Sequence, residues 1–205
     1  MIHGKQTVFA VIISMMVAAA GAAAASSGNV SWAADPRTNC QVGYVSDEYT
    51  LTAASWTGPE VNGKAQGKGV VNMTIRSKDG KEQIAIQGEA EMVAGFVDGK
   101  VSLSKSKNGA FELTFEGTYN AAAMEAKGVM KRANGDTYDG EWKADSPEGK
   151  GIARLSNGSS YEGSWKAGKP HGYGVARNSA GKVEYAGEWN NGAPVTKPGQ
   201  ATKME

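Results

Sequence analysis

The chain has 205 residues, of which 40% are hydrophobic and 28 are glycine, with one cysteine and a formal net charge of +1. This size fits one domain, and the low hydrophobic content favours a thin, exposed sheet over a deep core. The near-neutral charge argues against nucleic acid as a partner, because nucleic acid requires a basic surface. The single cysteine excludes an internal disulfide.

The N-terminus differs in character from the rest of the chain. Lys5 is the only charged residue before Asp35, and the 19 residues 7–25 are apolar or small throughout. This pattern predicts a secretory signal peptide, a signal helix over residues 1–25, with a second cleavage position after Ala33. It places the mature protein in the periplasm or outside the cell. The alternative is an uncleaved N-terminal helix that anchors the protein in the membrane, since a run of this length just spans a bilayer.

Residues 34–52 follow without a recognisable repeat. We expect them to form an N-terminal cap over the first repeat or a lead-in to it. Cys40 lies in this stretch and has no neighbouring catalytic or metal-binding signature. In an oxidising compartment, it is either a buried, unused thiol or the site of an intermolecular disulfide.

A Tyr-x-Gly-x-Trp pattern occurs three times in the C-terminal part of the chain. Glycines follow the first two copies at offsets of nine and eleven residues, at 149 and 151 and again at 172 and 174. Three weaker copies lie upstream. The glycine at the centre of each of the six copies is Gly58, Gly88, Gly117, Gly140, Gly163 or Gly187, and successive centres are 30, 29, 23, 23 and 24 residues apart. We expect a repeat domain of about six repeats over residues 53–195, followed by a flexible tail over 196–205.

Each repeat alternates with a period of two, which is the period of a β-strand. Tyr161, Gly163 and Trp165 therefore point to one face of the strand, and the residues between them point to the other. A helix would spread these residues around its circumference, and its glycines would destabilise it. Asn-Gly pairs at 134–135 and 157–158 predict type I′ turns between repeats.

The repeating unit is therefore two strands in about 23 residues. One hairpin cannot bury its aromatic face alone, but stacked hairpins can. The predicted fold is all-β, an elongated single-layer antiparallel sheet that grows by one hairpin per repeat.

The pattern Tyr-x-Gly-x-Trp-x-x-Gly-x-x-His-Gly-x-Gly, complete in residues 161–174, resembles the MORN repeat. The likeness is close over residues 128–194, and residues 55–69 resemble the opening repeat of exported bacterial MORN proteins. The resemblance implies a long sheet surface for protein assembly, often by self-association, or for phospholipid head groups. The residues that carry the signature are Trp56, Gly58, Gly63, Gly67, Gly69, Gly117, Gly128, Tyr138, Gly140, Trp142, Gly149, Gly151, Tyr161, Gly163, Trp165, Gly168, His171, Gly172, Gly174, Tyr185, Gly187 and Trp189.

No residue pattern in the chain predicts catalysis or a metal site. His171 is the one histidine outside the expected leader, and we expect it in a turn. A metal would need three or four converging ligands, and the sequence has no Cys/His cluster that could supply them. It also lacks the Gly-x-Ser-x-Gly motif that carries the nucleophile of serine hydrolases. We therefore predict no enzyme activity, no cofactor and no metal. The strand carboxylates are expected on a solvated face: Asp139, Glu141, Glu162, Glu184 and Glu188.

These observations favour a non-catalytic interaction scaffold of the bacterial envelope or exterior, which assembles with a protein partner or with itself as a homodimer. The short final repeat, residues 185–194, is the expected dimer contact or cap. An open sheet leaves its terminal strands free to pair, which is why the contact is expected there.

Two other readings use different residues. Phospholipid head groups would be bound through the loop residues Lys143, Lys166, Lys169 and His171. Envelope glycans would be bound by the aromatic face, through Tyr161, Trp165 and Trp189. Tyr173 stands where other copies have lysine, as in Gly67-Lys68-Gly69, and is a further candidate contact residue.

Overall fold

The computed structural model describes residues 29–144 and 146–195, and every regular element in it is a β-strand. The expected signal helix at 1–25 and the expected tail at 196–205 lie outside the described residues. The part of the chain that is described holds no helix long and apolar enough to cross a membrane. The strands are β1 (Val30–Ala34), β2 (Gln41–Val45), β3 (Tyr49–Trp56), β4 (Glu60–Val61), β5 (Lys64–Ala65), β6 (Gly67–Ser77), β7 (Gln83–Val93), β8 (Phe96–Lys107), β9 (Ala110–Asn120), β10 (Glu125–Arg132), β11 (Thr137–Lys143), β12 (Ser146–Arg154), β13 (Ser160–Lys166), β14 (Lys169–Arg177), β15 (Val183–Asn190) and β16 (Ala193–Pro194).

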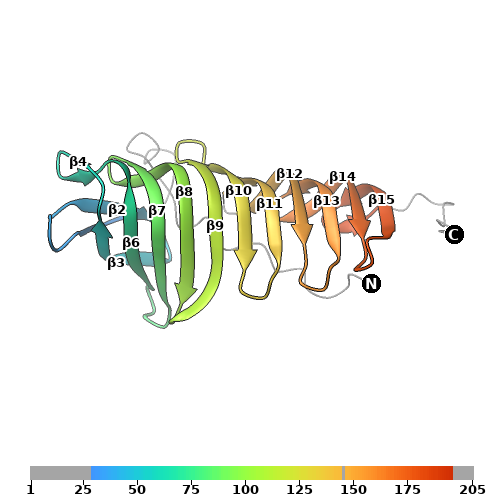
Figure 1. The fold of residues 1–205 in the computed structure, drawn as a ribbon, viewed down its shortest axis with the longest axis horizontal. Helices are drawn as coiled ribbons and strands as arrows, with labels where there is room; N and C mark the ends of the chain where they lie inside the picture. Colours follow the sequence, from blue (N-terminus) through green and yellow to red (C-terminus); the bar gives the residue numbers. More distant parts are fainter. Residues whose placement is uncertain (1–28, 145, 196–205) are drawn as a thin grey trace.

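A 12-stranded antiparallel sheet runs along the whole molecule, in the order β16-β15-β14-β13-β12-β11-β10-β9-β8-β7-β6-β3. Figure 1 shows it as an elongated, twisted ribbon of hairpins, with the longer strands at the N-terminal end. Each strand from β7 to β15 pairs with both of its neighbours in sequence, so the sheet grows hairpin by hairpin. The expected all-β sheet of stacked antiparallel hairpins is confirmed.

The expectation of a single layer is wrong at the N-terminal end. There a four-stranded sheet, β1-β2-β5-β4, forms a second layer, and β1 and β2 pack against β3. The reason is the composition of β6 and β7, whose inner faces carry plain apolar residues such as Ile75 and Ile84. Those side chains need a cover, and Val42 and Tyr44 of β2 join the same core. The expected boundaries at residues 34 and 53 fall inside β1 and β3.

Glycine faces glycine along the C-terminal half of the sheet. Within each hairpin the two facing glycines are eleven residues apart, as the offset in the sequence suggested. The glycine ladder crosses seven strands in register through Gly117, Gly128, Gly140, Gly151, Gly163, Gly174 and Gly187. Ala90 and Val101 continue it across β7 and β8 to Gly69 of β6.

The repeat centre assigned to Gly88 is therefore wrong, and Ala90 takes that position. In the repeats centred on Gly58, Gly163 and Gly187, a two-residue turn begins four residues after the centre. The turn after β7 is Ala94-Gly95, which places the centre at Ala90 because the turn sets the register of its hairpin. Gly88 lies two residues before this centre, at the position that tyrosine has in the clear repeats, such as Tyr161 before Gly163.

The Asn-Gly pairs between repeats do not form the expected type I′ turns. Gly135 and Gly158 have positive φ, of 89° and 87°, but the asparagines before them do not. Both belong to longer connections: the Arg132 N–H donates to the Asp136 carbonyl around Gly135, and the Leu155 N–H donates to the Ser159 carbonyl around Gly158, each at 2.9 Å. Positive φ at both central residues occurs in other turns: Asn62-Gly63, Ala94-Gly95, Asn108-Gly109, Ala167-Gly168 and Asn191-Gly192.

The glycine ladder predicts that an added methyl group is costly at its centre. A Cβ at Gly151 would overlap the hydroxyl and the ring of Tyr138. We expect Gly151→Ala to lower the free energy of unfolding by about 3 kcal/mol, as overpacking does. The matched control is Gly181→Ala, where no atom lies within 4 Å and only a φ of +79° is strained, at a cost of about 1–2 kcal/mol. Chemical denaturation measures both, and equal losses would contradict the packing account.

Candidate functional site

The inner face of the repeat sheet holds an unbroken chain of aromatic rings. Successive ring centroids are 4.7 to 6.1 Å apart, with interplanar angles of 78° to 90°. Edge-to-face contacts of this kind are the favoured geometry for aromatic pairs. The chain alternates between tyrosines and tryptophans of neighbouring hairpins and runs through Phe115, Trp142, Tyr138, Trp165, Tyr161, Trp189 and Tyr185.

Each tryptophan of this aromatic chain is bound to the glycine ladder of the preceding strand. The Trp165 Nε1–H donates to the Gly151 carbonyl at 3.0 Å, and the Trp189 Nε1–H donates to the Gly174 carbonyl at 3.1 Å. The absence of a Cβ on these glycines lets the ring approach the backbone this closely. Trp142 makes a longer contact of the same kind, 3.4 Å, with Gly128.

The tyrosine hydroxyls of the aromatic chain donate hydrogen bonds to backbone carbonyls of their own strands. The register of β13 on β14 shifts between Gly163 and Trp165, so that three residues of β14, 171–173, lie opposite Ser164 alone in a β-bulge. The Tyr161 hydroxyl donates to the Ser164 carbonyl at 2.9 Å. Tyr138 and Tyr185 make the same bond to the residue three positions on, each at 3.0 Å. Burial raises the pKa of Tyr161 to about 12, so the hydroxyl keeps the proton that it donates at alkaline pH, where an exposed tyrosine would ionise.

The aromatic residues of the repeat signature are therefore part of the core. Tyr161, Trp165 and Trp189 are no more than 7% exposed. Binding of envelope glycans would need exposed ring faces, which these three residues do not offer.

The candidate lysines lie near the side of the sheet where the hairpins close in tight turns such as Ala167-Gly168, which we call the turn side. Lys166 and Lys169 face each other across the turn between β13 and β14, and both are exposed. Lys143 closes β11 and is paired with Glu125 at 2.9 Å. Tyr173 lies on β14 opposite Glu188 and is 58% exposed, so its ring faces solvent on the outer face.

His171 and Cys40 are placed differently from what the sequence suggested. His171 lies within β14, because the preceding turn contains only Ala167 and Gly168 and the strand begins at Lys169. Cys40 is 1% exposed, and burial together with Glu60 raises the pKa of its thiol. An intermolecular disulfide would require the cap to open. Within residues 29–144 and 146–195, no three His, Cys, Asp or Glu side chains gather as metal ligands would.

The outer face carries three charged rows that sequence reasoning missed. The acidic row lies in register on alternate strands β7, β9, β11 and β13 and consists of Glu89, Glu116, Asp139 and Glu162. The first basic row, on the turn side of it, consists of Lys68, Lys100, Lys127 and Lys150. The second basic row, on the other side, consists of Lys131, Arg154 and Arg177. All eleven side chains are exposed.

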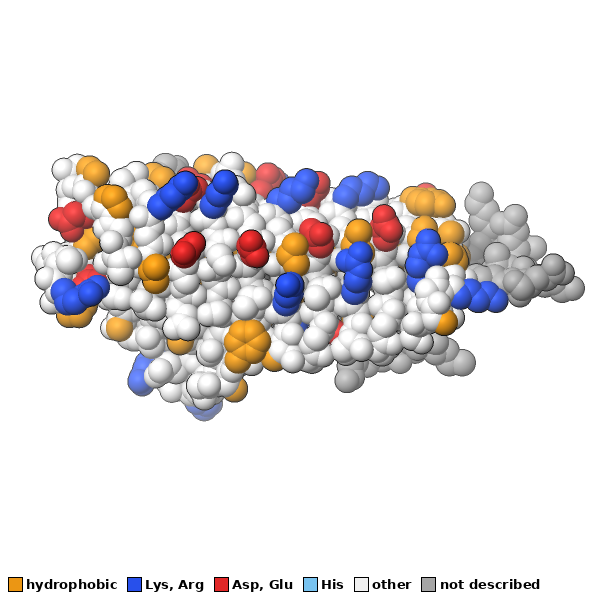
Figure 2. All heavy atoms as spheres, viewed as in Figure 1, with side chains coloured by type: hydrophobic (Ala, Val, Ile, Leu, Met, Phe, Trp, Pro, Cys, Tyr) orange, Lys and Arg blue, Asp and Glu red, His pale blue; other side chains and the backbone are white. Residues whose placement is uncertain are grey.

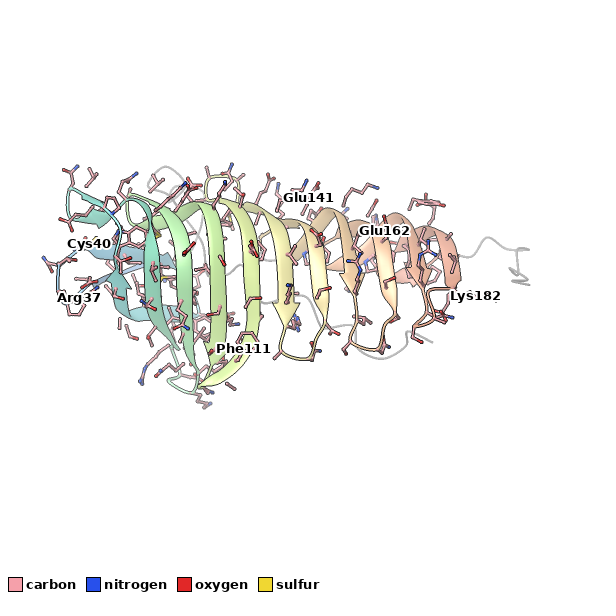
Figure 3. All side chains as sticks on the ribbon, in the orientation of Figure 1. Arg37, Cys40, Phe111, Glu141, Glu162 and Lys182 are labelled. Carbon is pink, nitrogen blue, oxygen red and sulfur yellow. The ribbon has the colours of Figure 1, made fainter. Side chains whose placement is uncertain are left out.

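Figure 2 shows these rows as a line of acidic side chains along the middle of the sheet, with lysine and arginine on both sides. Figure 3 labels Glu162 of the acidic row, and also Glu141, which lies in register with the first basic row. The sequence does contain a signal for the rows, since Lys131, Arg154 and Arg177 recur at intervals of 23 residues. Only the register of the strands shows that the rows lie side by side.

Two shallow hollows border the N-terminal end of the acidic row. They have volumes of about 540 and 630 Å³ and lie over β6 to β10. Val70, Ser102 and Glu116 line both hollows. Ser102 stands on β8 where the equivalent positions of β10 and β12 have valine and isoleucine, so a small side chain helps to open this part of the face.

Fold and packing define the class of the molecule as a β-hairpin repeat protein built on a glycine ladder. Four consecutive stretches, residues 115–137, 138–160, 161–181 and 185–195, match the family model of the MORN repeat. Residues 115–195 are therefore MORN repeats, and the resemblance seen in the sequence is confirmed there. The earlier hairpins, with centres at Gly58 and Ala90, lie before the matched residues. A search of curated proteins finds no match to the chain.

Tyr161 and Tyr173 belong to one repeat but lie on opposite faces of the sheet, which gives a test of this packing. Tyr161→Phe removes the donor to the Ser164 carbonyl, and we expect a loss of about 1–2 kcal/mol in the free energy of unfolding. Tyr173→Phe makes the same change on the exposed face and should stay within about 0.5 kcal/mol of the unmodified protein. Urea denaturation compares the two, and a larger loss for Tyr173→Phe would overturn the assignment of faces.

Proposed function

We propose that the protein is a non-catalytic scaffold of the bacterial envelope or exterior that mediates protein–protein assembly, foremost by self-association. MORN repeats are in general interaction or membrane-binding modules, and four of them make up residues 115–195. The observation that carries the proposal is the edge of β15, which no strand of the described residues covers over positions 183–187. The envelope location rests on the apolar stretch at residues 7–25, which is typical of an export signal.

Within the described residues, the edge of β15 is covered only over its last three residues, 188–190. β16 pairs with Trp189 and Asn190, and beyond it the Val195 N–H donates to the Glu188 carbonyl at 2.7 Å. Glu188 therefore directs its backbone groups away from β14, and by alternation Ala186 does the same. No strand of the described chain pairs with residues 183–187 on that side.

A second copy would fit this edge. Two β15 edges that pair antiparallel about a two-fold axis would satisfy the free backbone groups of both chains. Such pairing would also join the two sheets end to end and extend the surface available to other proteins. Association of this kind needs no exposed cysteine, which agrees with the burial of Cys40.

Light scattering coupled to size exclusion tests the proposal. We expect the purified protein to be a dimer, with or without reductant, and Ala186→Pro to be a monomer because proline lacks the N–H that edge pairing uses. Ala186→Val keeps the N–H and is the matched control, which should remain dimeric. A monomeric unmodified protein, or a dimer that persists in Ala186→Pro, would refute edge pairing.

A second candidate function is binding to phospholipid head groups at the turn side of the repeats. The observation that favours it is the pair Lys166 and Lys169, which present two exposed cations on either side of one turn. Lys143 contributes less, because Glu125 neutralises it.

Vesicle sedimentation tests this candidate directly. If it is correct, the double variant Lys166→Ala/Lys169→Ala should bind vesicles rich in phosphatidylserine at least tenfold more weakly, since each basic residue near an anionic surface contributes about 1 kcal/mol. Lys182→Ala, in the connection between β14 and β15 at the opposite side of the sheet, should bind like the unmodified protein. Equal losses for the two variants would exclude a site at the turn.

A further inference from the structure

The outer face of the repeat sheet carries a regular charge pattern that neither the core nor the edge of β15 uses. We propose that this face binds an extended peptide segment of another protein in the polyproline II conformation, with lysine or arginine at every third residue. The segment lies along the acidic row, across the strands, and its basic side chains meet Glu89, Glu116, Asp139 and Glu162 in turn.

The spacing of the acidic row selects this conformation. Neighbouring strands lie about 4.8 Å apart, so carboxylates on alternate strands repeat at about 9.6 Å. A polyproline II helix has three residues per turn and rises about 3.1 Å per residue, which gives a repeat of about 9.3 Å. Over the three intervals from Glu89 to Glu162 the mismatch accumulates to about 1 Å, which a flexible lysine side chain absorbs.

Other regular conformations do not keep this phase. Side chains on one face of a β-strand repeat at about 6.7 Å, and those on one face of an α-helix recur at about 5–6 Å and, at positions i and i+7, at about 10.5 Å. A strand could contact one carboxylate of the row but would lose register with the next. A helix that presents every seventh residue would drift by about 2.7 Å over the three intervals, about three times the drift of a polyproline II segment. A polyproline II segment also has no internal hydrogen bonds, so it can bend to follow the twist of the sheet.

Apolar side chains alternate with the carboxylates from Glu116 onward, whereas Ser102 lies between Glu89 and Glu116. Val129, Ile152 and Val175 lie in register with the acidic row on β10, β12 and β14, and each is half-buried. The proline rings or other small apolar residues of the segment would contact them between one basic side chain and the next. From Glu116 onward the row therefore alternates acidic and apolar contacts with the period that the peptide requires.

The two basic rows complete the site. The carbonyl groups of a polyproline II backbone are all free to accept hydrogen bonds. Lys127 and Lys150 on one side and Lys131 and Arg154 on the other can donate to them. The same cations would repel a segment that carries a positive charge at every position, so the face favours spaced charges over a continuous basic run.

The acidic row is free to bind such a ligand. Within the described residues, none of its four carboxylates makes an ion pair. The hollows beside Ser102 leave room at the N-terminal end of the row for a bulkier residue of the segment.

Fluorescence anisotropy with labelled synthetic peptides tests the proposal on the full chain. The probe is (Pro-Pro-Lys)4, and the comparison peptide has the same composition with its lysines at irregular spacing. We expect the regular peptide to bind at least tenfold more tightly than the irregular one. The double variant Asp139→Asn/Glu162→Gln should lose at least tenfold in affinity for the regular peptide, whereas Glu184→Gln, an exposed carboxylate of β15 outside the row, should lose nothing.

Three results would overturn the proposal: no binding of the regular peptide, equal binding of the two peptides, or unchanged affinity in the double variant. Because the two substituted carboxylates are exposed, thermal unfolding of the double variant should match that of the unmodified protein. The Ala186→Pro protein should bind the peptide as tightly as the unmodified protein does, which separates this proposal from self-association through β15.

Discussion

The close approach of aromatic rings to a backbone without Cβ atoms is the constraint on which the repeat sheet depends. Gly151 shows it most clearly, because Tyr138 lies against its Cα while its carbonyl accepts the Trp165 indole N–H. One glycine thus serves two rings from neighbouring hairpins. The same arrangement recurs along the ladder, and it lets a thin sheet bury tyrosine and tryptophan without a second layer of structure to cover them.

This way of packing separates the two faces of the sheet by role. The rings and glycines occupy the inner face, which leaves the outer face, the turns and the part of the β15 edge that no described strand pairs with as the surfaces available to a partner. The N-terminal hairpins bury their inner face in a different way. Where Gly88 replaces the repeat tyrosine and Met92 the tryptophan, the inner face is an ordinary apolar core, and β1 and β2 cover it.

The sequence alone predicts the hairpin unit, because Tyr161 and Trp165 alternate with a period that only a strand provides. It does not predict the centre of the degenerate repeat at Ala90, since that position depends on the Ala94-Gly95 turn and no ring marks it. Nor does it predict the second sheet. That sheet is needed because the apolar inner faces of β6 and β7 would otherwise be exposed to solvent, and these residues belong to no repeat motif. The three charged rows could have been found from their 23-residue spacing, but their arrangement side by side follows from strand register.

The central claim is that rings of neighbouring hairpins stabilise one another. A double-mutant cycle between Tyr138 and Trp165, whose ring centroids are 5.2 Å apart, measures this directly. With each residue replaced by leucine, singly and together, the account predicts a favourable coupling energy of about 0.5–1.5 kcal/mol in the free energy of unfolding. Additive losses, with no coupling between the two residues, would contradict it and would reduce the aromatic chain to independently buried side chains.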